Sequence, residues 1–396
     1  MLAGQPLGSL LDVRQVHVIT PGDHYSPNTG SAVPTVVHGL CQGLPAGEPR
    51  PVVVLERGTM QERYPSADPI EYQPAKRLPR PIARLSRYLD APVGPALGRR
   101  PMAARGWAAA LSAQGSWAPS IIIGHNAPQL PRLVDADRHR PVLYAHNHVL
   151  RTYGPREAGR ALDRVHRVVA VSDALASQLA DRLPPRLRGR VVVVRNGVDC
   201  GFFARPSGSF GREGPMRIAF VGRMIPDKGA DVLVSAVSRM RAAKEVTLTL
   251  VGSSGFSAND PLTPFERSVR QSIESARSRA LIRPFAPRPE IAAFLATVDV
   301  LVVPSRWAEP FALTVLEGMA AGCAVVASDI GGIPEAAGGA ALLVPPRDPD
   351  ALAVALDSLA EDEPRRLRLV RASLERARAR DWHVVGRELV LALEGS

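Results

Sequence analysis

Short runs of Val, Ile, Leu and Ala recur along the chain, and the segments between them carry polar residues at helical spacing. In the first half the runs are VHVIT (16–20), PVVVLE (51–56), SIIIGH (120–125), PVLYAH (141–146), RVVAVS (167–172) and RVVVVRNG (190–197). One intervening stretch, ALASQLADRL (174–183), has the spacing of a helix. Unbroken apolar runs that alternate with amphipathic helices are typical of parallel strands buried on both faces.

The same pattern restarts after a segment rich in Gly, Pro and Ser. The second series is MRIAFVG (216–222), VTLTLVG (246–252), VDVLVVPS (298–305), CAVVASD (323–329) and AALLVPP (340–346). We therefore expect an α/β protein with two doubly wound domains. Their expected bounds are 1–198 for the first domain, 199–215 for the linker, 216–378 for the second domain and 379–396 for a last helix.

Composition agrees with a folded protein of this size. The 396 residues exceed what one core usually holds, and 45% hydrophobic with 22% charged residues is ordinary for a globular chain. The net charge of +11 comes from arginine, because lysine occurs only at Lys76, Lys228 and Lys244. No basic stripe with interleaved aromatic residues is present, so we expect no nucleic-acid partner, whereas an anionic substrate or membrane surface fits the charge.

Cysteine usage and hydropathy bear on the compartment. Cys41, Cys200 and Cys323 are far apart and form neither a disulfide framework nor a metal motif, so a reducing cytoplasm is expected. No signal peptide and no apolar run near ~20 residues is visible, so no bilayer-spanning helix is expected. LPRPIARLSRYL (78–89) reads either as a basic amphipathic helix on an anionic membrane or as a solvated helix, and both interpretations stay open.

Two cations follow the first strand of the second series. That strand ends at Gly222, and Arg223 and Lys228 lie in the loop before the next helix. Ligands of open parallel sheets bind beyond the carboxyl ends of the strands, and a helix N-terminus attracts anions. The loop predicts a diphosphate site, although it is no Walker sequence, and two ordinary surface cations are the alternative.

The run EPFALTVLE carries two carboxylates eight positions apart, Glu309 and Glu317. On one helix they would differ in direction by roughly 80°, so they share no helix face. With Glu309 in the loop above the strand and Glu317 on the helix, both could reach one elongated ligand. Carboxylates accept hydrogen bonds from vicinal hydroxyls such as those of ribose or a sugar ring. A loop charge and a solvated helix charge are the alternative.

Taken together, these motifs resemble a known family. GRMIPDKG (222–229), EPFALTVLEGMAAGCAVVASDIGGIPE (309–335), VSDALASQL (171–179) and RNGVD (195–199) are similar to those of the retaining, nucleotide-sugar-dependent glycosyltransferases of family 4. The resemblance implies the GT-B fold, in which two Rossmann-like domains with parallel sheets face a central cleft. It covers almost all of the chain.

The resemblance assigns roles on the donor side. Arg223 and Lys228, after Gly222, would bind the diphosphate and stabilise its growing charge, Glu309 would contact the donor sugar, and Glu317 would hold the ribose. The remaining donor-side candidates are the backbone amides of Phe311, Ala312 and Leu313, Arg283 near the base, and Gly30 with Ser31 in PNTGSAVP (27–34). The family usually has Gly at Ala312, Ala at Gly318 and Gly at Ser31, so the fit of the donor sugar is in question.

Three histidines follow strands of the first domain. His146 matches the family histidine over the donor sugar, and His125 with Asn126 resembles acceptor-side residues, as does His148. A purely structural role is the alternative for His125 and His148. No thiol or carboxylate cluster completes a metal site, and DAD (135–137) and DPD (348–350) lack the signals around a metal motif. We expect no cofactor and no divalent metal.

The last segment, RARARDWHVVGRELVLALEG (376–395), is expected to form one amphipathic helix with Trp382 near its start. In the family this helix crosses back onto the first domain. It would then clasp the two domains and couple closure of the cleft to the alignment of donor and acceptor.

The resemblance and the motifs together predict a retaining, metal-independent hexosyltransferase that moves a sugar from a nucleotide-sugar, with UDP-sugar favoured over GDP-sugar, to a hydroxyl acceptor. Front-face attack is favoured because the motifs supply no assured nucleophile, and double displacement through Glu309 stays open. The acceptor is expected to be a cell-surface polysaccharide or a specialised metabolite such as an aminocyclitol antibiotic. We expect a cytoplasmic monomer or homodimer, free or peripheral to a membrane. The alternatives are a sugar-phosphate synthase, a nucleotide-sugar epimerase, or a non-catalytic membrane- or nucleic-acid-binding module. A dehydrogenase is disfavoured because GxGxxG is missing after the first strand.

Overall fold

The chain folds as two compact units. The computed structural model describes residues 13–76, 90, 94, 98–206, 214–243, 246–275 and 280–394. Among these residues, the first unit takes in the chain up to Ser26, Ser31–Arg195 and the segment from His383 onward. The second unit consists of Pro27–Gly30 and Asn196–Trp382. The expected helix over 78–89 lies outside the described residues.

The first unit contains a seven-stranded sheet with strand order β3-β2-β1-β4-β5-β6-β7. All neighbouring strands are parallel. The strands are β1 Arg14–Val18, β2 Val52–Glu56, β3 Asp68–Tyr72, β4 Ser120–His125, β5 Arg140–Ala145, β6 Arg167–Ala170 and β7 Val191–Val193. The order reverses between β1 and β4, so the carboxyl ends of these two strands flank the crevice where doubly wound sheets bind ligands.

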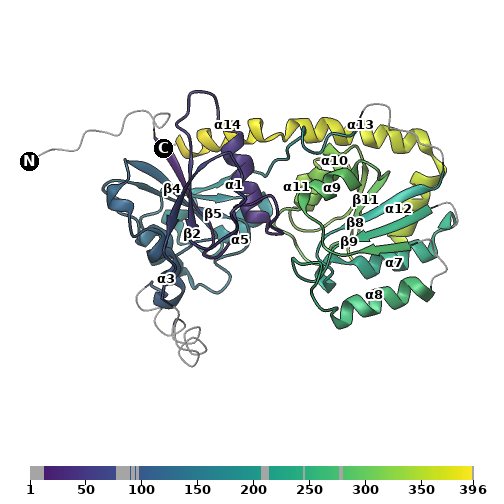
Figure 1. Cartoon of the computed structure of the whole chain (residues 1–396), viewed down its shortest axis with the longest axis horizontal. Coiled ribbons are helices and arrows are strands. Elements are labelled where there is room, and N and C mark those ends of the chain that lie inside the picture. The colour runs from purple at the N-terminus through teal and green to yellow at the C-terminus, as the bar shows by residue number, and fades with distance from the viewer. Residues whose placement is uncertain are drawn as a thin grey trace, which may run out of the picture. The chain divides into compact units, whose positions relative to one another are not determined.

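Helices cover both faces of this sheet (Figure 1). The helices are α1 Ala32–Gln42, α3 Pro101–Ala110, α4 Pro155–Ala161, α5 Asp173–Ala180, α6 Pro185–Arg188 and α14 Trp382–Glu394. Residues of β2 alternate between two cores: Val52 and Val54 pack with Trp107 of α3, whereas Val53 and Leu55 pack with Val37 of α1. This alternation explains why the strand is apolar at its first four positions, Val52 to Leu55.

The last helix, α14, packs on the first unit. Leu393 O lies 2.8 Å from His166 Nε2, and Arg167 Nε donates to Ala392 O at 3.3 Å. Gly386 allows the close approach, because a Cβ at this position would lie 1.9 Å from Gly43 O. The expected single helix is in fact two: α13 ends at Ala379, and α14 begins at Trp382.

The second unit contains a six-stranded parallel sheet with strand order β10-β9-β8-β11-β12-β13. Its strands are β8 Met216–Val221, β9 Val246–Val251, β10 Ala280–Arg283, β11 Val300–Val303, β12 Ala324–Ser328 and β13 Leu342–Val344. Its order reverses between β8 and β11. The prediction of two parallel-sheet α/β domains is therefore confirmed.

One face of the second sheet packs against α7, α8 and α12, whose apolar residues form one core with β8, β9, β11 and β12 (Figure 1). The helices of this unit are α7 Ala230–Arg239, α8 Pro264–Ser275, α9 Arg288–Leu295, α10 Leu313–Ala320, α11 Ile333–Ala337, α12 Pro349–Glu361 and α13 Glu363–Ala379. A short 3-10 helix, η4 Pro226–Lys228, precedes α7.

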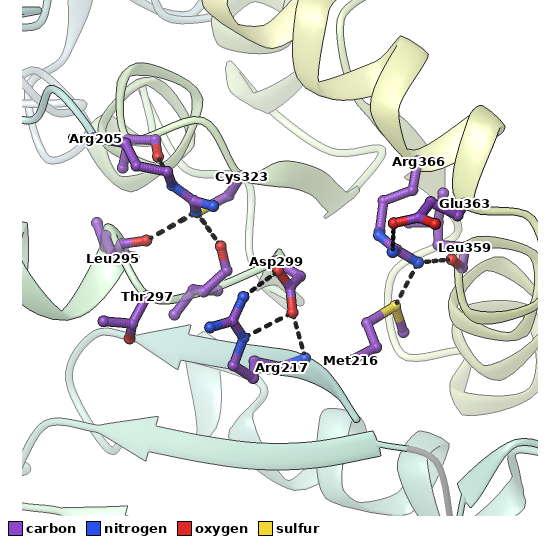
Figure 2. A network of polar contacts seen from close by, with 12 residues as sticks. Arg205, Met216, Arg217, Leu295, Thr297, Asp299, Cys323, Leu359, Glu363 and Arg366 are labelled. Carbon is purple, nitrogen blue, oxygen red and sulfur yellow. Dashed lines mark hydrogen bonds and ion pairs between the residues drawn. The ribbon is translucent and has the colours of Figure 1, made fainter. Parts of the chain in front are cut away.

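The described part of the expected linker is built into the second unit. Arg205 Nε donates to Ala321 O at 2.9 Å, and Arg205 Nη2 donates to Leu295 O at 3.3 Å and to Val298 O. Figure 2 shows this guanidinium beside the two-pronged ion pair between Arg217 and Asp299. A guanidinium with five donors satisfies several loop carbonyls at once, so Arg205 anchors the chain where it enters this unit.

Two strands escaped the sequence analysis, and both are sheet edges. β3 (DPIEY) and β10 (ALIR) each pair on one side only, and exposed and partly buried residues alternate along most of both strands. An edge strand carries fewer buried apolar residues and tolerates proline, so it lacks the continuous apolar signal of a central strand.

Candidate functional site

The loops after β8 and β11 meet at the carboxyl end of the second sheet. η4 follows β8 and ends at Gly229, whose φ of +71° is in the left-handed region. A Cβ at Gly229 would lie 1.9 Å from Pro304 O, so no other residue allows this approach without a shift of the backbone. Gly229 therefore brings Lys228 next to the loop that carries Glu309.

Lys228 and Glu309 form an ion pair at this position. Lys228 Nζ lies 2.8 Å from Glu309 Oε2, and Ser305 Oγ donates to Glu309 Oε1. The Glu309 side chain is 7% exposed and that of Lys228 is 24% exposed. Both carboxylate oxygens thus have a donor, and the negative charge is oriented by a cation and a hydroxyl.

A glycine turn fixes the backbone at Glu309. Gly332 N donates to Glu309 O at 2.7 Å. Gly331 has a φ of +61°, and a Cβ there would lie 2.6 Å from Glu309 O. The GGIP sequence after β12 therefore holds the backbone of the Glu309 loop. From the sequence alone, GGIP predicts a turn but not this contact.

Arg223 lies exposed on the loop after β8. Its guanidinium carbon is 6.0 Å from the centre of the Phe256 ring, a distance at the limit of a cation–π contact. Gly222 beside it is approached closely, because a Cβ at Gly252 would lie 1.9 Å from Gly222 O. The loops after β8 and β9 thus pack backbone to backbone and leave the Arg223 side chain toward solvent.

Glu317 lies on α10 and is paired with a residue that the sequence analysis missed. Arg288 Nη1 lies 2.7 Å from Glu317 Oε1, and the Glu317 side chain is 11% exposed. The Arg288 guanidinium carbon also lies 5.3 Å from the centre of the Phe203 ring. Arg288 opens α9 just after β10, and no local motif marks it, because its partner is far along the chain.

The start of α10 lies next to Glu309. Phe311 and Ala312 are 8% and 3% exposed, and Ala312 is the residue before the first helical residue, Leu313. The first amides of a helix have no acceptor within the helix, so this end offers donors to an anion or a hydroxyl. The Ala312 methyl is buried in the protein.

In the first unit, His125 and His146 lie side by side. His125 Nδ1 lies 2.8 Å from His146 Nε2, and the rings stack with centroids 5.1 Å apart. A third histidine, His17 of β1, lies behind them with its Nδ1 2.9 Å from His125 Nε2. Burial lowers the pKa of His146 to about 3 and that of His125 well below 6.5, so both rings are neutral near pH 7.

The side chain of Asn126 holds the backbone of His146. Its φ of +55° is left-handed, and its side-chain oxygen accepts a hydrogen bond from His146 N at 2.8 Å. Asn126 N in turn donates to Tyr144 O at 2.8 Å. One of the two acceptor positions of the side-chain oxygen is therefore used by the backbone of His146.

His148 is apart from this group. Burial lowers its pKa, with smaller contributions from Arg182 and Arg151, and it bonds to the backbone of Gln178. Among the described residues, no hydrogen bond or ring stacking joins His148 to His146. Among the described residues, no group of three or more His, Cys, Asp or Glu is arranged to hold a metal ion.

Comparisons with known proteins agree with this geometry. Residues 33–202 match the family model "Glycosyltransferase Family 4", and residues 215–362 match "Glycosyl transferases group 1". The glycogen synthase of Mycobacterium tuberculosis is 30% identical over 312 residues, which cover 69% of this chain and 68% of that protein. The chain belongs to glycosyltransferase family 4. The resemblance seen in the motifs is thereby confirmed.

One further sequence relative and one solved structure are similar to this glycosyltransferase. The D-inositol 3-phosphate glycosyltransferase of Stackebrandtia nassauensis is 35% identical over 236 residues, which cover 54% of this chain and 52% of that protein. The crystal structure of Anabaena HepE in complex with UDP and glucose has a TM-score of 0.70 and 16% identity, and covers 96% of this chain and 99% of that one. The glycosyltransferase has the GT-B fold.

Arg283 of the glycosyltransferase is separate from the other donor-side candidates. Its guanidinium carbon lies 5.5 Å from the centre of the Phe294 ring. It lines a cavity of about 510 Å³ together with Arg217, Thr249 and Glu290, and none of Arg223, Lys228, Glu309 or Glu317 lines that cavity. The Arg283 side chain thus lies near α9, although the residue is exposed.

Gly30 and Ser31 lie before α1 of the glycosyltransferase. A Cβ at Gly30 would lie 2.1 Å from Phe256 Cδ1, so a side chain there would displace this ring. Ser31 Oγ donates to Asp23 Oδ2 at 3.2 Å and does not cap α1 with its side chain. The serine that replaces the family's glycine therefore has a partner of its own in Asp23.

The glycosyltransferase has no described helix that is long and apolar enough to cross a membrane. The residues that sequence reasoning missed at the site are Ser305, Arg288 and His17. Ser305 is the last residue of the predicted strand 298–305, and His17 lies within the predicted strand 16–20. A polar residue among apolar neighbours is a signal that could have pointed to both. For Arg288 the sequence contains no such signal.

Proposed function

We propose that the enzyme transfers a hexosyl group from a nucleoside-diphosphate sugar to a hydroxyl acceptor, with retention of the anomeric configuration and without a divalent metal. The observation that carries this proposal is the ion pair of Lys228 with Glu309 at 2.8 Å, at the switch point of the second sheet. A cation and an oriented carboxylate at one place are what a phosphate and a sugar hydroxyl require.

Lys228 and Arg223 are proposed to bind the two phosphates. The bond from the anomeric carbon to the phosphate oxygen breaks with the growth of negative charge on the diphosphate, and cations fixed in advance lower the energy of that state. Lys228 is fixed by Glu309 and by the turn at Gly229. These two cations would do the work of a metal ion, which supports a metal-independent reaction.

Glu309 is proposed to hold the donor sugar rather than to attack it. Both of its oxygens already accept hydrogen bonds, from Lys228 and Ser305, and this lowers their nucleophilicity. We therefore favour front-face attack, in which the acceptor hydroxyl attacks the anomeric carbon as the phosphate leaves. The leaving phosphate oxygen takes the proton of the acceptor, so no protein base is needed.

Glu317 is proposed to bind the ribose hydroxyls through Oε2, because Oε1 is held by Arg288. In the first unit, His146 is proposed to contact the donor sugar or the acceptor as a neutral imidazole. His125 does not face a substrate directly in this proposal, since both of its ring nitrogens are bonded to other histidines.

UDP-sugar is the favoured donor, with GDP-sugar second, because a similar fold was crystallised with UDP and glucose. The acceptor is proposed to be a growing cell-surface polysaccharide or a specialised metabolite with several hydroxyls, such as an aminocyclitol. Two relatives are named for glycogen and for D-inositol 3-phosphate, and both of these compounds carry many hydroxyls.

A thermal-shift panel of UDP, GDP, ADP and dTDP, each with and without EDTA, tests this proposal. A ligand that binds the native state raises the unfolding temperature in proportion to its affinity, and we expect the largest rise with UDP, unchanged by EDTA. No rise with any nucleotide would overturn the proposal. The anomer released first on slow donor hydrolysis, read by proton NMR, tests retention, and an inverted anomer would contradict it.

A further inference from the structure

Three histidines from three adjacent strands form one hydrogen-bonded chain in the first unit. His17 lies on β1, His125 ends β4, and His146 follows β5, and these strands are neighbours in the sheet. His17 Nδ1 lies 2.9 Å from His125 Nε2, and His125 Nδ1 lies 2.8 Å from His146 Nε2. Both ring nitrogens of His125 thus take part in a hydrogen bond within the chain, whereas His17 and His146 each use only one ring nitrogen in it.

The three rings have little freedom to rotate. His17 and His125 stack with centroids 5.2 Å apart and an interplanar angle of 18°. Tyr144 stacks on His146 at 4.8 Å and on His125 at 5.2 Å. His17 and His125 are fully buried, and His146 is the half-buried end of the chain. Its backbone N–H is fixed by Asn126.

All three rings are neutral near pH 7. Burial lowers the pKa of His17 to about 3, and burial together with the repulsion of His146 and His17 lowers the pKa of His125 well below 6.5. A neutral imidazole carries one N–H and one bare nitrogen. Because each bond needs one donor and one acceptor, only two orders are consistent: all three protons on Nδ1, or all three on Nε2.

The inner end of the chain decides between these orders. His17 Nε2 is buried and has no hydrogen-bond partner among the described residues. A buried N–H without an acceptor is rarer and costlier than a bare acceptor, so His17 Nε2 is the bare nitrogen. His17 then donates to His125, and His125 donates to His146. The proton of His146 is consequently on Nδ1, the nitrogen at the outer end.

We propose that His17 and His125 are positioning residues, which lock His146 in its Nδ1–H tautomer and so present a hydrogen-bond donor to an oxygen of the sugar substrate. The inference rests on the proposed function of His146. The chain does not conduct protons, since a proton that moved inward would reach His17 Nε2, from which no described group removes it. It holds one tautomer and one ring orientation.

Nitrogen-15 NMR of the histidine rings tests the tautomer directly. With 15N-histidine in the whole enzyme, and the His17→Leu and His146→Ala variants for assignment, we expect protonated Nδ1 and bare Nε2 for all three rings. Replacement of His17 by Leu removes the donor to His125, so we expect the His146 signals to shift toward the Nε2–H form. A His146 ring that carries its proton on Nε2 in the native enzyme would overturn the proposal.

Kinetics of matched variants test the consequence. We expect His17→Leu to lower kcat about 10-fold with an unchanged KM for the donor, because one hydrogen bond in the transition state is weakened. His17→Asn keeps an N–H close to the Nδ1 position and should restore most of the activity. An equally low kcat in both variants, with native His146 signals, would contradict positioning. If His17→Leu does not fold, the native spectrum and His17→Asn still decide.

The two proposals fail differently. If His146→Ala has full activity, the role of His146 in the reaction is wrong, whereas the NMR signals still report whether the chain sets its tautomer. If His146→Ala is inactive and the native ring carries its proton on Nε2, the proposed function stands and the positioning role falls.

Discussion

Lys228 Nζ lies 2.8 Å from Glu309 Oε2, and the two residues come from loops that end neighbouring strands, β8 and β11. The pair joins the proposed phosphate contact to the proposed sugar contact. A phosphate that binds Lys228 and a hydroxyl that binds Glu309 would therefore belong to one ligand. We therefore expect replacement of either residue to impair both contacts.

Replacement of Glu309 by Gln tests the pair. Gln keeps the shape but removes the charge that orients Lys228, so we expect kcat to fall ~100-fold or more, as for the loss of other preorganised electrostatic contacts. Turnover of the donor by the purified variant is the measurement. Arg239→Ala is the matched control, because it breaks an exposed ion pair with Asp350 and should leave turnover unchanged. Full activity of Glu309→Gln would remove Glu309 from the mechanism.

Replacement of Arg288 by Met tests the ribose contact. Without Arg288, Glu317 loses its charged partner and its orientation, so we expect the affinity for UDP to fall about 10-fold. The affinity for inorganic pyrophosphate, which has no ribose, should not change. Calorimetry with both ligands makes the comparison. An equal loss for both would show that Arg288 acts on the phosphates or on the fold instead.

Gly318 packs directly against the side chain of Leu301, which fills the space that a side chain at position 318 would need. A Cβ at Gly318 would lie 2.3 Å from Leu301 Cδ2 and 3.2 Å from Leu301 Cβ, and Leu301 is fully buried. We expect Gly318→Ala to destabilise the protein by about 1 kcal/mol, because overpacking of about 1–3 kcal/mol outweighs the better helix propensity of Ala.

The double variant Gly318→Ala with Leu301→Val should recover part of this loss, since the shorter side chain makes room for the methyl. Urea unfolding of the two single variants and the double variant measures the coupling. Strictly additive effects would show that the two side chains do not compete for space.

The buried histidines predict a loss of stability in acid. The pKa of His17 is about 3 in the folded chain and near 6.5 when unfolded, so the unfolded chain binds more protons between these values. The stabilisation is complete above pH 6.5 and falls as the pH is lowered toward 3, by roughly 1.4 kcal/mol per pH unit for each such histidine.

Urea unfolding at pH 6 and pH 5 measures this slope. We expect His17→Leu to have a shallower slope than the native enzyme by about one proton. A slope that is unchanged in His17→Leu would show that His17 titrates normally in the folded chain.

The central strands were predictable because they are buried on both faces. The run SIIIGH coincides with β4, and MRIAFVG differs from β8 only by the final glycine. The edges β3 and β10 were not predictable, since a strand with one neighbour needs no continuous apolar run. The break between α13 and α14 at Arg380 and Asp381 was missed because both sides have the same helical periodicity.

The candidate site also contains residues that the sequence predicts and residues that it does not. Lys228 and Glu309 were predictable from loops after strands, because the topology of a doubly wound sheet brings such loops together. Arg288 was not, since its contact with Glu317 depends on how α9 packs against α10. Arg283 was proposed from the family resemblance alone, because β10, the strand that it ends, was not predicted. The direction of its side chain, toward Phe294, depends on packing that the sequence does not state.

The most direct test is calorimetric binding of UDP and UMP to the native enzyme and to the variant with Arg223→Ala and Lys228→Ala. The account predicts that the native enzyme binds UDP ~100-fold more tightly than UMP, because each cation contributes a charge-assisted contact to the second phosphate. In the variant this preference should largely disappear, with UMP affinity much less affected. A variant that retains the full preference for UDP would contradict the diphosphate site, and with it the proposed reaction.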